Sequence, residues 1–121
     1  MLIGHATTGD LNAATYNVGV GLTALDAITT GDNNTAIGKD ALTENTTGAS
    51  NVAIGYEAMR DNVSSQGNVA VGMSALQESN GGEYNTAIGN NALRGTSNTN
   101  ITGDENVAIG AGTMKFNIGG A

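Results

Sequence analysis

Hydrophobic and polar positions follow one pattern that returns six times along the chain. Each copy reads Asn-(Thr/Val)-(Ala/Gly)-(Ile/Val)-Gly-x-x-(Ala/Thr)-(Leu/Met), and the copies begin at Asn17, Asn34, Asn51, Asn68, Asn85 and Asn106. The first five copies keep a constant 17-residue period, the last follows four residues late, and Ile3-Gly4 is a partial copy one period before Val20-Gly21. A fixed short period indicates one structural unit stacked on itself, in which each unit buries a face that it cannot bury alone.

The residues before each glycine alternate as they do in a β-strand. In the copy that starts at Asn34, Thr35 and Ile37 fall on one face, and Asn34 and Ala36 fall on the other. A second apolar pair, such as Ala41-Leu42, follows each glycine, so we expect two short strands and two turns in each 17-residue coil. Each first strand should end at its glycine, because the turn there needs a positive φ or a close approach of two backbones. These turn glycines are Gly21, Gly38, Gly55, Gly72, Gly89 and Gly110.

Stacked coils would place like residues above like residues, about 4.8 Å apart. We therefore expect two ladders to form the core, one of the aliphatic residues before each glycine and one of the Leu or Met that follows it. The predicted core residues are Ile37, Leu42, Ile54, Met59, Val71, Leu76, Ile88, Leu93, Ile109 and Met114. The Asn that starts each copy is interpreted as a ladder of amides that caps the turns, with sugar recognition by this polar ladder as the functional alternative.

The repeat covers most of the chain and predicts an all-β solenoid of about seven coils. No 3.6-residue apolar stripe is present, which argues against helices. We expect residues 1–114 to form one β-roll repeat domain, and residues 115–121 to form a cap or a junction to a following element. The four extra residues before the last copy lie within residues 95–102 and should bulge out at a turn.

A solenoid of this kind should not be stable alone. Each coil has few apolar side chains to bury, and their burial must offset the conformational entropy lost when the whole coil is ordered. The column that contains Ala36, Ala53 and Ala70 is uniformly small, and on an outward face it would permit close approach of a second sheet. We therefore predict an obligate oligomer in which each solenoid packs against its copies through this alanine face.

Composition and charge restrict the possible functions. The chain has a formal net charge of −7, which argues against binding a nucleic-acid backbone. It has no Cys, so disulfides, cysteine nucleophiles and thiolate metal sites are excluded. No apolar run approaches the roughly 18 residues of a membrane span. No signal peptide is visible in residues 1–10, so we expect neither membrane insertion nor export by that route.

Four copies, at residues 34–42, 51–59, 68–76 and 85–93, carry a resemblance to a known family. They resemble the YadA-like head repeats of trimeric autotransporter adhesins. The 17-residue spacing, with Asn-Thr-Thr-Gly at Asn45 to Gly48, is more similar to the related repeats of bacteriophage tail fibres. The resemblance implies a left-handed parallel β-roll, an obligate homotrimer with the rolls side by side, and a rod used for attachment to a cell surface.

The bacterial family carries a secretion signal, a coiled-coil stalk and a membrane anchor, and none is visible here. We therefore expect a phage tail-fibre or other virion appendage, located in the virion, that binds a host-surface glycan or protein and other virion proteins. The alternatives are the head of a bacterial trimeric adhesin on the cell surface and a purely structural virion decoration. An ice-binding solenoid would require a regular threonine array, and Val52 and Val69 interrupt it.

Catalysis and metal binding have little support in the sequence. His5 is the only histidine, no Ser/His/Asp set can be built around it, and we expect no enzyme activity and no cofactor. Glu44, Asp61 and Glu78 fall in one column of consecutive coils. Carboxylates in such a column could bind a hard cation such as Ca²⁺, or they could be solvated turn residues. We expect no metal site there.

Receptor contacts should use positions that vary between copies. The candidates directly after the repeat glycines are Lys39, Asp40, Tyr56, Glu57, Met73, Asn90 and Asn91. The loop at residues 95–102 is a further candidate. An exposed Tyr or Met at a turn is a suitable contact residue. The same side chains could instead fill grooves between protomers.

Overall fold

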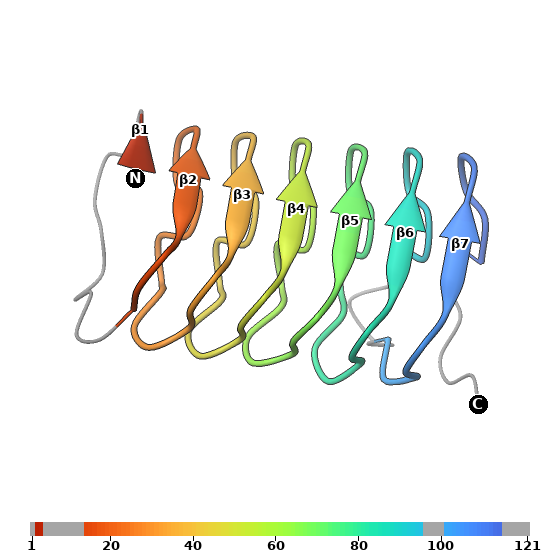
Figure 1. The fold of residues 1–121 in the computed structure, drawn as a ribbon. Helices are drawn as coiled ribbons and strands as arrows, with labels where there is room; N and C mark the ends of the chain where they lie inside the picture. The colour runs from red at the N-terminus through yellow and green to blue at the C-terminus, as the bar shows by residue number, and fades with distance from the viewer. Residues whose placement is uncertain (1, 4–13, 96–100, 115–121) are drawn as a thin grey trace.

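A computed structural model describes residues 2–3, 14–95 and 101–114 of the chain. These residues form an all-β parallel solenoid of about five turns, and none of them lies in a helix. His5, most of the 95–102 loop and residues 115–121 lie outside the described residues, as does the predicted cap or junction. Figure 1 shows the strands side by side along the length of the solenoid, all pointing in one direction.

Seven short strands of the described residues build one sheet. They are β1 (Leu2–Ile3), β2 (Val18–Val20), β3 (Thr35–Ile37), β4 (Val52–Ile54), β5 (Val69–Val71), β6 (Thr86–Ile88) and β7 (Val107–Ile109). Each pairs in parallel with the next, in the order β1 to β7. Ala36 pairs with Ala53, one period later, and Ala87 pairs with Ala108 across the longer interval that contains the insertion. The four additional residues therefore leave the strand register unchanged.

Each described coil contains one strand rather than the two expected. Ala41 and Leu42 lie in a turn, because Asp40 and Leu42 have φ angles of 59° and 50°, which an extended strand cannot contain. The Leu42 N–H nevertheless donates to the Ala58 carbonyl of the next coil at 3.1 Å. The same bond recurs at later coils, so this side is a hydrogen-bonded stack of turns.

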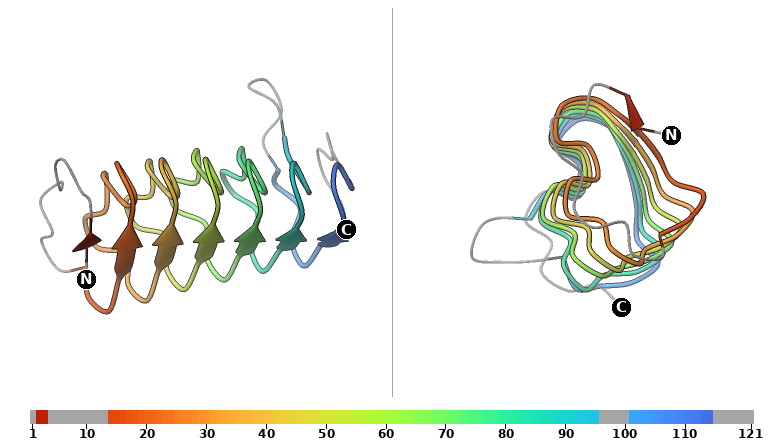
Figure 2. Two further views of the ribbon diagram at one scale, coloured as in Figure 1. Left: turned by 90° about the horizontal axis from the view of Figure 1, so that it is seen from above. Right: turned by 90° about the vertical axis from the view of Figure 1, so that its left-hand side faces the viewer.

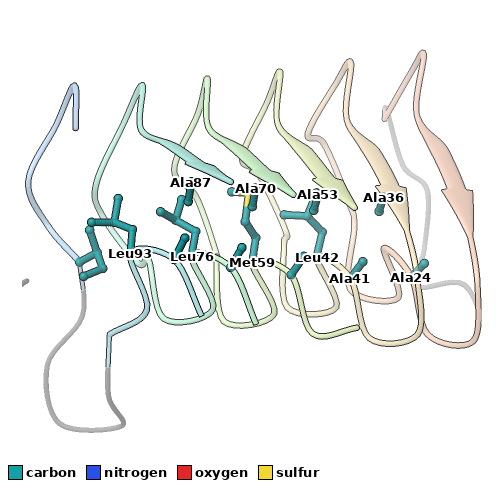
Figure 3. Close-up of a cluster of buried hydrophobic side chains, with 14 of the residues drawn as sticks. Ala24, Ala36, Ala41, Leu42, Ala53, Met59, Ala70, Leu76, Ala87 and Leu93 are labelled. Atoms are coloured by element: carbon teal, nitrogen blue, oxygen red, sulfur yellow. The ribbon is translucent and has the colours of Figure 1, made fainter. Parts of the chain in front are cut away.

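The core is filled by the alanines and not by the strand isoleucines. Ala36, Ala53, Ala70 and Ala87 are fully buried and face the fully buried Leu42, Met59, Leu76 and Leu93 (Figure 3). The prediction was wrong for Ile37, Ile54, Ile88 and Ile109, which are 39%, 36%, 39% and 65% exposed, and for Val71, which is half-buried. Met114, in the last described coil, is 40% exposed.

The physical reason is the narrow interior. The strand alternates in and out, so either its Ala or its Ile column faces inward. Opposite the strand stands a Leu or Met in every described coil from Leu25 to Leu93, and these side chains fill the space that an inward alanine leaves. The alanine face is consequently not available as an outward docking surface, and that part of the oligomer argument is also wrong.

The turn glycines show both predicted properties, a positive φ angle and a close approach of two backbones. Gly38 has a φ of 134°, and a Cβ placed on it would lie 2.5 Å from the Gly55 carbonyl oxygen of the next coil. A side chain there would require the backbones of the two coils to separate. The remaining turn glycines also have positive φ angles, so each strand from β2 to β7 ends at its glycine.

The repeated asparagines form a ladder that is buried from Asn34 to Asn85 and half-buried at Asn17 and Asn106, which confirms their structural interpretation. The Asn51 backbone N–H donates to Asn34 Oδ1 at 3.0 Å, and Asn51 Nδ2 donates to the Ser65 carbonyl oxygen at 2.8 Å. Asn51 Oδ1 in turn accepts the N–H of Asn68. Each amide therefore joins its own coil to the neighbouring one.

Candidate functional site

The outward side of the sheet carries Val, Ile and Thr side chains along its length, and we call it the aliphatic face. It consists of Val18, Val20, Thr35, Ile37, Val52, Ile54, Val69, Val71, Thr86, Ile88, Val107 and Ile109. None of these residues is charged. In Figure 2 the strands form one side of the solenoid and the turns form the other, so the face extends along the whole described rod.

The predicted receptor-contact residues come together in two adjacent columns at the carboxyl ends of the strands. Tyr56 and Met73 are 43% and 45% exposed. Lys39 and Asn90 are also exposed, whereas Asp40, Glu57 and Asn91 are half-buried. The structure thus places all seven on the surface, beside the aliphatic face, in a position that suits either a receptor contact or a contact between protomers.

Lys39, Asp40 and Tyr56 interact with one another in this region. Lys39 Nζ donates to Asp40 Oδ2 at 2.7 Å and lies 5.3 Å from the centre of the Tyr56 ring. The Thr23 hydroxyl also donates to Asp40. The hydrogen bond from Lys39, followed by that from Thr23, lowers the pKa of Asp40, and the bond to Asp40 raises the pKa of Lys39.

Arg60 organises the next part of this surface. Its Nε and Nη2 donate to the two carboxylate oxygens of Asp61 at 2.6 and 2.8 Å, which is a bidentate pair. Arg60 Nη1 lies 3.3 Å from Glu57 Oε1, and Gln77 Nε2 donates to Glu57 Oε2 at 3.1 Å. The pKa of Arg60 is raised, first by its hydrogen bond to Asp61.

The three candidate metal ligands do not converge. Glu44 is exposed, Asp61 is engaged by Arg60, and Glu78 is only 6% exposed. Burial raises the pKa of Glu78, and the charge of Asp61 raises it further. Within the described residues no group of three or more His, Cys, Asp or Glu side chains is placed to hold a metal ion.

Two other groups of residues that the sequence suggested as binding sites lie wholly or partly in the interior. The amides of Asn34, Asn51, Asn68 and Asn85 are fully buried, so the sugar-binding alternative for the ladder is wrong for them. At the end of the 95–102 loop, Ile101 is 1% exposed and its N–H donates to the Glu78 carbonyl at 2.8 Å. Ile101 is therefore part of the core, whereas Thr102 is exposed and residues 96–100 lie outside the described part of the chain.

Two exposed tyrosines were missed by the sequence analysis. Tyr16 and Tyr84 are 83% and 55% exposed and occupy the column directly before the asparagine ladder. This column also varies between copies, with Asn33, Ser50 and Gly67 in the intervening coils. The criterion of variable positions, applied on the amino side of the strands as well as on the carboxyl side, would have found them.

No protein-family model matches the chain, and neither the curated proteins nor the solved structures contain a match to it. In the described part of the chain, no helix is both long and hydrophobic enough to cross a membrane.

Proposed function

We propose that this chain is a segment of a trimeric attachment rod, most closely a phage tail fibre or related virion appendage. The single observation that carries the proposal is the uncharged aliphatic face. All-parallel sheets are usually covered on both faces, and monomeric proteins rarely expose a long contiguous apolar patch. Here the inner face packs on Leu42 and its equivalents, while Ile37, Ile54 and Ile88 on the outer face remain exposed in the single chain.

A second copy of the same chain is the partner that this face fits best. The exposed side chains repeat with the strands along the described length of the rod, so a matching surface must have the same repeat. The number of three copies, the left-handed coil and the count of about seven coils come from the resemblance to adhesin heads and tail fibres, and they are part of the proposal. The aliphatic face takes the role that the alanine face was expected to have.

Attachment in this proposal uses the side chains that vary between coils. A rigid oligomeric rod presents several copies of each turn to a surface at once, which strengthens weak contacts. Lys39, Tyr56 and Met73 are the exposed candidates at the carboxyl ends of the strands. We assign the chain no catalysis, cofactor, metal, nucleic-acid partner or membrane insertion. A purely structural role in the virion is the competing function, and the bacterial adhesin head is the competing origin.

Two measurements test the proposal. Light scattering on the purified chain is expected to give the mass of a trimer. Fluorescently labelled protein is expected to bind some members of a panel of bacterial strains, and Tyr56→Ala with Met73→Ala is expected to weaken that binding without changing the mass. A monomer in solution would overturn the oligomeric rod. A trimer that binds no strain would instead favour the purely structural role.

A further inference from the structure

Tyr84 is an exposed aromatic side chain whose position is set by a glycine in the preceding coil. Its ring lies over Gly67, where an added Cβ would be 2.6 Å from Tyr84 Cδ1 and 2.8 Å from Cε1. The equivalent positions in the other described coils carry side chains, all at positive φ: Tyr16, Asn33, Ser50 and Glu105. Among these coils, the column contains glycine only at residue 67, where the Tyr84 ring occupies the space that a side chain would take.

Polar groups border the ring. Gln66 Nε2 donates to the Tyr84 hydroxyl at 3.4 Å and to Glu83 Oε2 at 3.3 Å. The Glu83 backbone N–H donates to Asp104 Oδ1 of the next coil at 2.8 Å. The result is an aromatic surface, 55% exposed, beside the Gln66 amide and the Glu83 carboxylate. This group lies at the amino ends of the strands, opposite the predicted contact residues at the carboxyl ends.

We propose that Tyr84, together with Gln66 and Glu83, binds a pyranose unit of a cell-surface carbohydrate. A pyranose has an apolar C–H face that packs on an aromatic ring, and a rim of hydroxyls. Carboxylates accept hydrogen bonds from hydroxyls, and an amide both donates and accepts. Tyrosine has few rotatable bonds, and a ring that is already positioned loses little entropy on binding. This inference rests on the proposed attachment function and adds to it a second contact surface, at the amino ends of the strands, with a stated ligand class.

Tyr56 is less suited to this role, although it is also exposed. The Lys39 ammonium group lies 5.3 Å from the centre of its ring, so a sugar would have to compete with this cation for the ring. Tyr16 has nearly the same backbone conformation as Tyr84, with φ angles of 59° and 56°. Tyr16 is therefore a matched control for an exposed tyrosine in the same column.

The test is saturation-transfer NMR with methyl glucopyranoside, methyl galactopyranoside and N-acetylglucosamine, each at millimolar concentration. The wild-type chain and Tyr16→Ala are expected to transfer saturation to the C–H protons of at least one sugar, and Tyr84→Ala is expected to lose the transfer. Gly67→Ser is expected to weaken the affinity about tenfold. The same backbone position holds serine at Ser50, whose φ is 58°, but a Cβ at residue 67 would displace the Tyr84 ring.

Equal transfer in wild type and Tyr84→Ala would overturn the site, as would full affinity in a folded Gly67→Ser chain. Transfer to none of the three sugars would overturn the carbohydrate assignment. Cell binding separates these failures from failure of the attachment function. If Tyr84→Ala binds cells as well as wild type, the Tyr84 site is wrong and attachment stands. If the wild-type chain binds no cells, attachment itself is wrong.

Discussion

Single glycines control how closely two coils can stack. Gly55 has a φ of 133°, and a Cβ there would lie 2.6 Å from the Gly72 carbonyl oxygen. Gly112 also has a positive φ, 67°, but an added Cβ would meet nothing within 4 Å. Gly112 therefore tests a left-handed backbone position with open space around it, whereas Gly55 combines a φ that residues with a side chain rarely adopt with a close approach to the next coil.

We expect Gly55→Ala to lower the free energy of unfolding by about 2–4 kcal/mol, because both strain and overlap with the next coil oppose it. Gly112→Ala should cost about 1 kcal/mol, from backbone conformation alone. Urea denaturation followed by circular dichroism measures both values. Equal losses at the two positions would show that the close approach at Gly55 has no energetic weight.

Glu78 gives the stability a dependence on pH. Burial, and then the charge of Asp61, raises its pKa above the usual 4.5. The folded state therefore binds the proton more tightly than the unfolded state. The ionised form destabilises the fold at pH values above the folded pKa, and this penalty disappears as the pH falls below the unfolded value.

Glu78→Gln is accordingly expected to raise the melting temperature at neutral pH, since it removes the charge of a residue that is only 6% exposed. Below the unfolded pKa of glutamate the two proteins should melt at nearly the same temperature. Thermal melts across this pH range measure the difference. A variant that is less stable than wild type at neutral pH would contradict the expected sign of the effect.

At the scale of the elements, the coils are joined by three parallel hydrogen-bonded stacks. The strands pair in register, the turns at Leu42 and its equivalents donate to the next coil, and the asparagine amides connect backbone groups across coils. The asparagine stack is the most sensitive to single substitutions, because each amide forms hydrogen bonds with several buried groups at once.

Asn51→Ala should destabilise the chain by about 2–4 kcal/mol, since it leaves the Asn68 N–H and the Ser65 carbonyl without the bonds that Asn51 provides. Asn90→Ala is the matched control, because Asn90 is exposed, and it should change stability by less than about 0.5 kcal/mol. Chemical denaturation of both variants provides the comparison. A cost near zero at Asn51 would mean that water replaces the amide.

At the scale of the whole molecule, the aliphatic face determines the proposed assembly. Ile54 and Ile88 project outward from β4 and β6, away from the two end strands of the sheet. Charges placed there would have to be buried if copies of the chain pack together through this face, and burying an unpaired charge is strongly unfavourable.

The double variant Ile54→Glu with Ile88→Glu is therefore expected to be monomeric or unfolded at micromolar concentration, as measured by light scattering and circular dichroism. Thr30→Glu with Thr47→Glu adds the same charge at exposed turn positions and should retain the oligomer. If the isoleucine variant keeps the wild-type mass and fold, the aliphatic face is not the interface.

The seven contact residues predicted from their variation between copies do lie together on the surface, since residues one period apart must stack once the period is known. Tyr84 does not follow from the variation after the repeat glycines, because it precedes its strand. Its contact with Gly67 joins residues of two different coils, and a single glycine in a variable column has no visible meaning until the ring is placed over it.

The period and the alternation by themselves determined the stacked parallel strands and their ends at the glycines, because these features follow from backbone geometry and spacing. Only the tertiary structure decided which strand face is inside. Alternation allows both choices, and the space left beside Leu42, Met59 and Leu76 selects alanine over isoleucine. The tertiary structure also decided that each described coil has one strand and not two, because positive φ angles close the other side of the coil as a turn.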